Sequence, residues 1–216
     1  MPLVDVEFEL GEEGLPSDVD SYIGKAKARI EQYQEVHPAT SRGFVASDFV
    51  TVYRAMRVIA DGGLGPCRSF CEWGSGFGVV ASLAAMLGLE AHGIEIDRSL
   101  WENSVALARE SGLPVNYVLG SFVPPGGEVI AEELYSSHGG EFFWLETNSD
   151  DAYQSLGLDP NDFDVIFAYP WPGEDWVIAR LFEHFAAHGA LLLTYVQPGV
   201  VCLRRKVGKP RYPASR

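Results

Sequence analysis

With 216 residues, of which 47% are apolar, the chain is long enough to bury one sizeable hydrophobic core. No apolar run approaches the roughly 20 residues that a membrane-spanning helix needs. The net charge of −14 repels phosphate backbones, which argues against nucleic acid as a partner.

Basic residues gather at the C-terminal end, where six of the 16 lie between Arg204 and Arg216 without an acidic residue among them. We expect this end to be solvated, with residues 208–216 forming a flexible basic tail. The N-terminus carries no basic-then-apolar signal peptide, so we expect a cytoplasmic protein that binds no membrane. The oligomeric state stays open.

Cysteine and histidine usage argues against metal and disulfide frameworks. Three cysteines are an odd number, and an iron–sulfur site built on Cys67 and Cys71 would need a third cysteine where Gly74 stands. His184 and His188 are four residues apart, but no third ligand accompanies them. We therefore predict no metal site.

The elements in chain order begin with a predicted helical extension over residues 1–65. Apolar residues alternate over 4–10, which favours a short edge strand or a lead-in. Ser17 and Asp18 are expected to cap a helix that runs to about residue 35. Asp48, with Ser47, is expected to open a second helix that stops at about residue 60.

Strands and helices then alternate over residues 66–207, which is typical of a parallel sheet covered on both faces. The strands are expected at residues 67–73, 91–96, 115–119, 164–168, 190–196 and 200–207. The helices are expected at residues 79–87, 98–111, 128–135, 150–156 and 174–187. Residues 120–162 are the hardest to interpret, with 141–147 predicted to be extended and a lid left open.

The first strand of this region leads into a glycine-rich loop. Glu72 ends an apolar segment, Gly74, Gly76 and Gly78 follow at alternate positions, and an apolar helix begins at Val79. Glycine lets the backbone turn sharply and lets a ligand approach closely, while the helix directs unpaired N–H groups at that ligand. A dinucleotide fingerprint would place its third glycine at position 79, where valine stands.

The pattern Glu72-x-Gly74-x-Gly76-x-Gly78 resembles motif I of the class I S-adenosylmethionine-dependent methyltransferases. The resemblance implies that the three glycines bring backbone against the cofactor, that Ser75 offers a backbone N–H, and that Glu72 receives the methionine ammonium. A purely structural carboxylate is the alternative for Glu72.

A second match to this family is the strand that ends in Gly93-Ile94-Glu95-Ile96-Asp97. By resemblance, Glu95 accepts hydrogen bonds from both ribose hydroxyls and Ile96 packs on one face of the adenine, whereas Asp97 is expected to cap a helix. Where the family often has an acid for the adenine amino group, this chain has Ser121 and Phe122, which are expected to accept that hydrogen bond and to stack on the ring.

The segment Tyr169-Pro170-Trp171-Pro172-Gly173 follows the fourth strand, where amino-group methyltransferases place a short motif against the acceptor nitrogen. Tyr169 stands where that motif has Asn or Asp, so the likeness lies in position rather than in sequence. We expect Tyr169 to orient the acceptor and Trp171 to form a wall of its site, as the candidate catalytic residues. Glu174 and Asp175 are expected either to attract a cationic amine or to begin the next helix.

The resemblance, over roughly residues 41–196, implies a doubly wound, mostly parallel α/β sheet of the Rossmann-like methyltransferase kind. Its C-terminal end would be shortened, because only about 20 residues follow the fifth strand of the sheet. The segment over residues 41–47 would either line the methionine end of the cofactor pocket or be a plain interhelix loop.

The implied function is an S-adenosylmethionine-dependent methyltransferase (EC 2.1.1.-) whose acceptor is a small molecule or a protein side chain, with an amine as one candidate. A non-catalytic S-adenosylmethionine-binding or scaffold protein is the first alternative. An NAD(P)-dependent oxidoreductase is the second, and Val79 and the lack of a Tyr-x-x-x-Lys pair argue against it.

Overall fold

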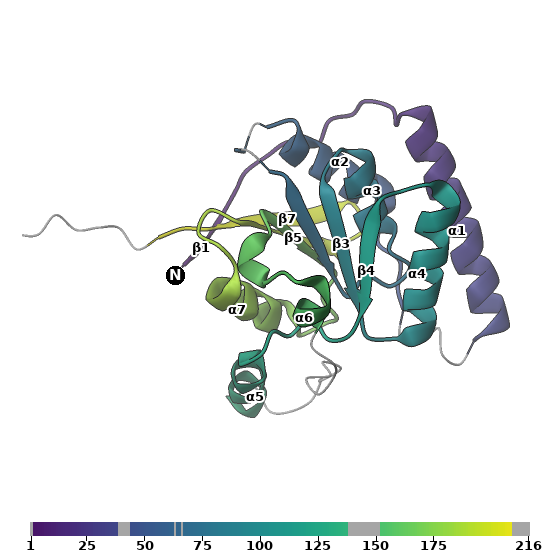
Figure 1. The fold of residues 1–216 in the computed structure, drawn as a ribbon. Coiled ribbons are helices and arrows are strands. Elements are labelled where there is room, and N and C mark those ends of the chain that lie inside the picture. The colour runs from purple at the N-terminus through teal and green to yellow at the C-terminus, as the bar shows by residue number, and fades with distance from the viewer. Residues whose placement is uncertain (1, 39–43, 63, 66, 138–151, 209–216) are drawn as a thin grey trace, which may run out of the picture.

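The computed structural model describes residues 2–38, 44–62, 64–65, 67–137 and 152–208. Seven strands form one sheet in the order β1-β7-β6-β5-β2-β3-β4 (Figure 1). The strands are β1 (Leu3–Asp5), β2 (Ser69–Trp73), β3 (Glu90–Glu95), β4 (Val115–Leu119), β5 (Val165–Ala168), β6 (Leu191–Gln197) and β7 (Val200–Lys206). The five neighbouring strands from β6 to β4 are parallel to one another, as the alternation of elements predicts.

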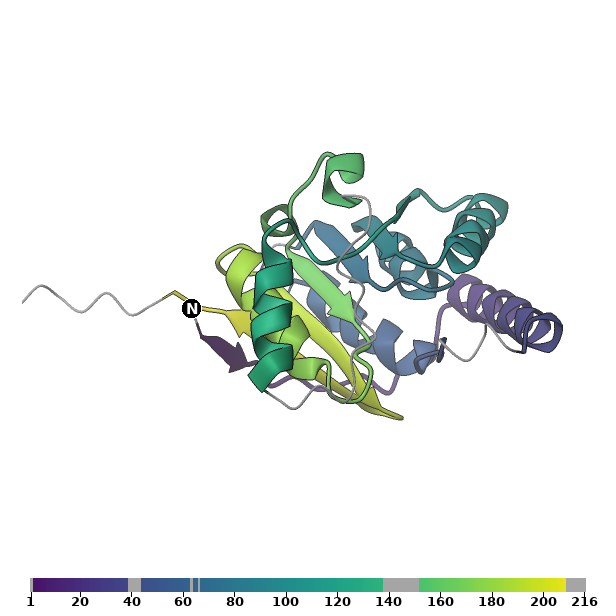
Figure 2. The same cartoon turned by 90° about the horizontal axis from the view of Figure 1, so that it is seen from below.

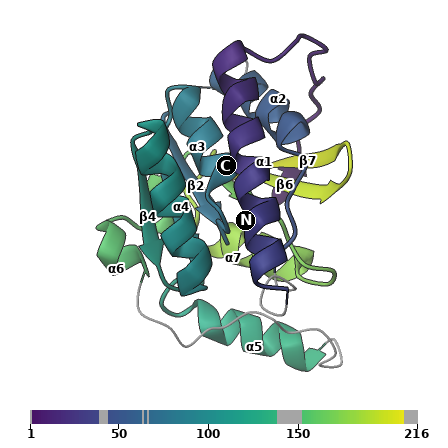
Figure 3. The ribbon, with the colours of Figure 1, turned by 90° about the vertical axis from the view of Figure 1, so that its right-hand side faces the viewer.

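Helices cover both faces of this sheet, which confirms the doubly wound α/β architecture. They are α1 (Ser17–Val36), α2 (Phe49–Ala60), α3 (Val79–Met86), α4 (Arg98–Ser111), α5 (Gly127–Ser137), α6 (Ala152–Leu156) and α7 (Asp175–Phe185). Buried residues of α1, α2, α3 and α4 share one core cluster, and those of α5, α6 and α7 belong to a second. Figure 3 shows α1 in front of α3 and α4, with α5 apart from them.

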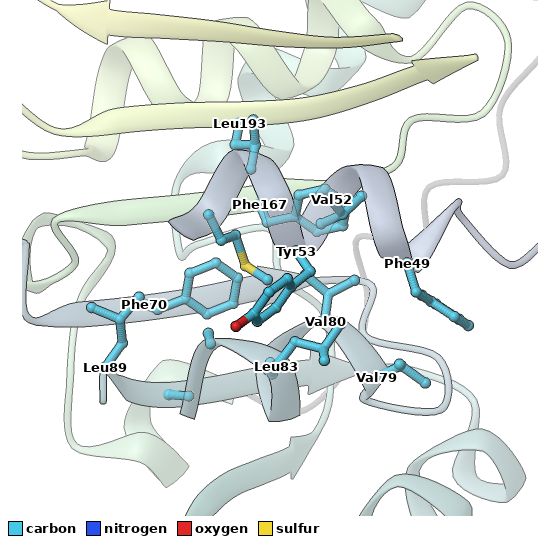
Figure 4. Packing of buried hydrophobic residues seen from close by; sticks show 14 of the residues in the cluster. Phe49, Val52, Tyr53, Phe70, Val79, Val80, Leu83, Leu89, Phe167 and Leu193 are labelled. Atoms are coloured by element: carbon cyan, nitrogen blue, oxygen red, sulfur yellow. The ribbon is translucent and has the colours of Figure 1, made fainter. Parts of the chain in front are cut away.

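The first core cluster lies directly behind the candidate site. Figure 4 shows Val52 and Tyr53 of α2 close to Val80 and Leu83 of α3, with strand residues such as Phe167 behind them. All four of those helix residues are at most 4% exposed. Burial of side chains of this size stabilises the fold by about 1.5–3 kcal/mol each, so the helices that carry the site are firmly attached to the sheet.

The edge of the sheet beyond β6 differs from the expected shortened end. β7 runs antiparallel to β6, and β1, from the N-terminus of the chain, pairs antiparallel with β7 through Leu3↔Lys206 to Asp5↔Arg204 (Figure 2). β7 is the last strand in the described part of the chain, and the N-terminal strand β1 supplies the seventh strand of the sheet. Whether residues 1–65 form a unit of their own stays a prediction.

Two of the three predicted helix caps are confirmed. The Asp48 carboxylate accepts hydrogen bonds from the N–H groups of Val50 and Thr51, and the Asp97 carboxylate accepts them from Ser99 and Leu100. The prediction for α1 is wrong, because Ser17 and Asp18 lie within its first turn and Pro16, which has no side-chain acceptor, precedes it.

The basic C-terminal end also differs from the expectation of a solvated segment. Arg204 to Lys206 belong to β7, and the buried Lys206 ammonium donates to the backbone oxygens of His184 and Ala186 at the end of α7. The cation thus satisfies carbonyl groups that a helix C-terminus leaves unpaired. The expected tail at 209–216, the extended stretch at 141–147 and residues 41–43 lie outside the described residues.

A short 3-10 helix at Pro160–Asp162, which the sequence does not predict, precedes β5. No helix in the described part of the chain is long and apolar enough to cross a membrane.

Candidate functional site

The glycine-rich loop joins the carboxyl end of β2 to α3 and is tied to the neighbouring strand. The N–H groups of Gly74 and Ser75 both donate to the Ile94 oxygen, at 3.0 and 2.9 Å. All three motif glycines have positive φ angles, 72° at Gly74, 53° at Gly76 and 68° at Gly78. Side-chain-bearing residues rarely adopt such angles, so the alternation of glycines follows from the shape of the loop.

Ser75 needs a correction, because its N–H is bonded to β3 and is not available to a ligand as predicted. Its hydroxyl is different: the residue is 4% exposed, and Oγ has no hydrogen-bond partner within the described structure. A buried hydroxyl without a partner is uncommon, because losing water without replacement costs free energy. Ser75 also lines the pocket described below, so a polar ligand there would satisfy it.

Glu72 lies on β2 beneath the start of α3 and is 5% exposed. Its Oε2 atom accepts a hydrogen bond of 2.8 Å from the Ala81 N–H in the first turn of α3. Burial raises the pKa of this carboxyl well above its ordinary 4.5, the bond from Ala81 opposes the shift, and the nearby Glu95 charge adds to it. A positive ligand group beside Glu72 would favour the ionised form.

Glu95 is the last residue of β3, and its carboxylate is bonded to the glycine loop. One carboxylate oxygen accepts from the Gly76 N–H at 2.6 Å and the other from the Asp97 N–H at 2.8 Å. Burial raises the pKa of Glu95, and these backbone hydrogen bonds lower it in part. The next residue, Ile96, is 40% exposed although it is a large apolar side chain. The predicted cofactor residues Glu95 and Ile96 thus lie directly beside the glycine loop.

A shallow pocket, partly open to solvent, lies over the loop on the Glu72 side. Three parts of the chain line it: residues 44–47 with Phe49 before and at the start of α2, Glu72 with the glycine loop and the first residues of α3, and Phe167 and Tyr169 at the end of β5. The described part of the 41–47 segment therefore does line a pocket. Glu95 is not among its lining residues.

Aromatic side chains connect the N-terminal extension to the loop. The Phe77 ring, within the motif, lies edge-on to Phe44 at 5.0 Å and to Tyr33 of α1 at 5.3 Å between ring centroids. A Cβ placed on Gly76 would fall on the Phe44 ring. Sequence reasoning missed these contacts, because Tyr33, Phe44 and Phe77 are far apart in the chain and carry no shared pattern.

Tyr117 of β4, also missed, lies beneath the same loop. Its hydroxyl donates to the Gly78 oxygen at 2.5 Å and is 3.0 Å from the Ser82 hydroxyl. A Cβ on Gly78 or on Gly93 would fall on the Tyr117 ring, so two glycines on different elements make room for one side chain. No local signal reveals such a pairing.

The residues after β4 lie near the opposite core. The Ser121 hydroxyl oxygen accepts from the Val123 N–H at 3.1 Å. The Phe122 ring stacks on Trp73 with 5.3 Å between centroids and 9° between planes, packed against the second core cluster. One face of Phe122 is therefore covered by Trp73, and adenine stacking on Phe122 stays a prediction.

The turn after β5 contributes one residue to the pocket. Tyr169 lines it, and its ring lies edge-on to Tyr195 of β6 at 4.8 Å. Trp171 is half-buried but is not among the lining residues of the pocket. Its backbone N–H donates to the Glu174 carboxylate at 3.2 Å. Glu174 is buried, which raises its pKa, and directly precedes α7. Glu174 thus stands at the start of the helix, although its side chain makes no hydrogen bond to the helix, and attraction of a cationic amine stays a prediction.

The three cysteines, Cys67, Cys71 and Cys202, are free, and Cys71 is buried. No group of three or more metal-binding side chains occurs among the residues that the structure describes. The candidate site is therefore the glycine loop with its two carboxylates and the pocket above them.

Comparison with solved structures identifies the fold. A methyltransferase from Geobacter sulfurreducens aligns with a TM-score of 0.52 and 13% identity, covering 89% of this chain and 99% of that one. The chain has the Rossmann-like fold of class I methyltransferases. An RNA methyltransferase from Salinibacter ruber, solved with S-adenosyl-L-homocysteine, aligns with a TM-score of 0.47 and 16% identity over 76% of this chain and 94% of that one. No family model and no curated protein matches the sequence.

Proposed function

We propose that this methyltransferase-fold chain binds S-adenosylmethionine at the glycine loop and transfers its methyl group to an acceptor. The observation that carries the proposal is the lining of the pocket, which includes the buried Glu72 carboxyl and the unpartnered Ser75 hydroxyl. Both lie at a loop that contains three glycines with positive φ angles. Polar groups buried in this state are expected where a polar ligand completes them.

The residues are suited to two polar parts of this cofactor, the methionine ammonium and the ribose hydroxyls. Glu72 would receive the methionine ammonium, with the Ser75 hydroxyl beside it, while Glu95 would accept from the ribose hydroxyls. A carboxylate oxygen has two lone pairs, so the Glu95 bonds to Gly76 and Asp97 leave acceptor capacity for a ribose. Ile96 would supply an apolar surface for the adenine, and Ser121 and Phe122 are retained as predicted adenine contacts.

The cofactor supplies an electrophilic methyl group on a sulfonium, and the chain's own contribution is alignment. In-line displacement needs the nucleophile and the methyl carbon within roughly 3–3.5 Å of each other, and positioning of this kind accounts for much of the rate enhancement. Tyr169 lines the same pocket as residues 44–47 and Glu72, where its hydroxyl would orient the acceptor. Trp171 is proposed to act from the rim of the acceptor site.

The pocket also favours one charge class of acceptor. Within the described structure its lining includes one carboxylate, Glu72, and no Lys or Arg side chain. With no cationic side chain in this lining to pair with an anionic acceptor, we propose a neutral or amine-bearing acceptor, on a small molecule or on a protein side chain.

Calorimetry with S-adenosylhomocysteine, NAD and NADP tests the cofactor assignment. S-adenosylhomocysteine should bind with a Kd of roughly micromolar order, while NAD and NADP should not bind. Glu95→Ala should weaken that binding, because charge-assisted hydrogen bonds to a ribose contribute about 1.5–3 kcal/mol each before compensation. Glu90→Ala, at the exposed opposite end of the same strand, is the matched control and should bind as wild type does. Binding of NAD without S-adenosylhomocysteine would overturn the proposal in favour of an oxidoreductase.

Turnover is a separate question from binding. Protein supplied with S-adenosylmethionine carrying a deuterated methyl group would be incubated with paired amine and carboxylate analogues, followed by mass spectrometry. Transfer to amines or neutral hydroxyls supports the proposed acceptor class. Transfer to the carboxylate partners alone would contradict it, and binding with no transfer to any class would favour the non-catalytic alternative.

A further inference from the structure

Tyr117 occupies a position beneath the glycine loop that two glycines keep open. It lies on β4, two strands away from β2 in the sheet, and is 7% exposed. Its ring fills the space where a Cβ of Gly78, in the loop, or of Gly93, in β3, would lie. The ring therefore touches the loop and the strand beside it at once.

The Tyr117 hydroxyl donates its single hydrogen to the Gly78 oxygen at 2.5 Å. The Ser82 hydroxyl, 3.0 Å away, must then donate to Tyr117 rather than accept from it. The Gly78 oxygen also accepts from the Ser82 N–H at 3.0 Å, so both of its lone pairs are used. Each bond on this carbonyl group acts on the last peptide of the loop.

The backbone conformation of Gly78 sets the angle at which the glycine loop joins α3. Gly78 is the residue before α3 and has a left-handed φ of 68°, a conformation that only a glycine adopts readily. The first turn of α3 carries Val79 and Val80, which line the pocket, and Ala81, whose N–H is bonded to Glu72. A rotation of the Gly78 peptide would therefore displace the pocket wall and the bond to Glu72 together.

Tyr117 itself is held in place from behind. The indole N–H of Trp101, in α4, donates to the Tyr117 backbone oxygen at 3.1 Å, and β4 pairs with β3 at this residue. Burial raises the pKa of the Tyr117 hydroxyl well above 10, so the hydroxyl stays protonated and remains a donor at physiological pH.

We propose that Tyr117 is a positioning residue, which fixes the Gly78 peptide and thereby holds the glycine loop in the conformation that binds the cofactor. The proposal rests on the proposed function for the identity of that cofactor. Without the hydroxyl, the loop would sample other conformations, and binding would have to restore the order that Tyr117 now provides.

Tyr117→Phe tests this, because phenylalanine keeps the ring between Gly78 and Gly93 and removes only the hydroxyl. Tyr53→Phe is the matched control. Tyr53 is a buried tyrosine of α2, and the charges that act on its hydroxyl are those of Arg57, Asp18 and Asp61, none of which belongs to the glycine loop. Denaturant titration of both variants would separate loss of stability from loss of loop order.

Amide hydrogen exchange of the ligand-free protein is the first readout. Loss of one buried hydrogen bond should raise the exchange rates of residues 74–82 about three- to tenfold in Tyr117→Phe, with no such local rise in Tyr53→Phe. Should Tyr117→Phe not fold, Ser82→Ala removes the hydroxyl that donates to Tyr117 and should give a smaller rise in the same residues. Unchanged exchange over residues 74–82, or an equal rise in the control, would overturn the proposal.

S-adenosylhomocysteine affinity is the second readout, measured where all variants are folded. Tyr117→Phe should bind about three- to tenfold more weakly, and Tyr53→Phe should bind as wild type does. Faster exchange with unchanged affinity would overturn the positioning role. If the wild-type protein binds no S-adenosylhomocysteine, the proposed function fails, while the exchange experiment still decides whether Tyr117 holds the loop.

Discussion

The glycine loop after β2 and the turn after β5 both follow the carboxyl ends of neighbouring parallel strands, but different interactions fix their conformations. Backbone N–H groups of Gly74, Ser75 and Gly76 bond the loop to β3 and to the Glu95 carboxylate at its end. The turn from Tyr169 to Glu174 is closed by two hydrogen bonds between Trp171 and Glu174, and its tyrosine and tryptophan stay half-buried.

This difference indicates in which half of the site the fold restricts the residue types that can be present. The loop depends on backbone conformation and on two buried carboxylates, so few residue types could occupy its positions. The turn offers aromatic surface, and many side chains could satisfy its backbone. We therefore expect substitutions in the loop to affect stability and cofactor affinity, and substitutions in the turn to affect transfer alone.

The largest effect is expected from Gly93→Ala. Its added Cβ would overlap the Tyr117 ring and come within 3.0 Å of the Ser75 Cβ, and overpacking of this kind costs about 1–3 kcal/mol. The free energy of unfolding, measured by denaturant titration, should fall by that amount. Gly24→Ala in α1 is the control, since nothing lies within 4 Å of the position that its Cβ would take, and it should leave stability unchanged or raise it slightly. A Gly93→Ala protein as stable as Gly24→Ala would contradict the tight packing under the loop.

Glu72→Gln should lower cofactor affinity while it raises stability at neutral pH. The raised pKa of the folded carboxyl means that, above about pH 4.5, the unfolded state binds fewer protons than the folded state. The free energy of unfolding should therefore fall in wild type as pH rises through that region, and this contribution should be absent in Glu72→Gln. Denaturant titrations between pH 4 and 8 would show the difference; identical pH profiles would mean that Glu72 is ionised with an ordinary pKa.

Proton release should accompany cofactor binding if Glu72 receives the methionine ammonium. A cation beside the carboxyl lowers its pKa, so the bound protein would hold fewer protons than the free one. Calorimetric titration with S-adenosylhomocysteine in buffers of different ionisation enthalpy measures this directly. Wild type should release a fraction of a proton and Glu72→Gln should release less; equal release by both would place the ammonium elsewhere.

Tyr169→Phe should have the smallest effect on binding. The side chain lines the pocket, but the proposed cofactor hydrogen bonds come from Glu72, Ser75 and Glu95, so S-adenosylhomocysteine affinity should be unchanged within error. Once an acceptor is known, kcat should fall, because the hydroxyl that orients the acceptor is lost. A drop in cofactor affinity with unchanged kcat would assign Tyr169 to the cofactor half of the site instead.

The sequence predicts the position of the glycine loop between strand and helix, because the signals for it are local; its role in binding the cofactor stays a prediction. Glu72, the alternating glycines and Glu95 fall within 24 consecutive residues, each with a chemical reason to stand where it does. The Asp48 and Asp97 caps are equally local. In contrast, the space that Gly93 leaves for Tyr117, the Phe44 ring over Gly76 and the unpartnered Ser75 hydroxyl exist only after the chain has folded.

The pairing of the outer strands β1 and β7 likewise could not be predicted from local sequence. The alternation at residues 4–10 is compatible with a short edge strand or a lead-in, and the structure has a strand at Leu3–Asp5 only. Only the fold pairs this strand with β7 and makes the N-terminus supply the seventh strand. The acceptor stays open for a related reason, since Tyr169 and Trp171 resemble a family motif in position and not in sequence.

A structure with S-adenosylhomocysteine bound would test the proposed cofactor site most directly. We predict both ribose hydroxyls within about 3 Å of the Glu95 carboxylate, the ammonium beside Glu72 and Ser75, and the sulfur facing Tyr169. A ligand bound away from the glycine loop would contradict the proposal. So would a Tyr169 hydroxyl more than about 8 Å from the sulfur, because the hydroxyl could not then orient an acceptor for in-line transfer.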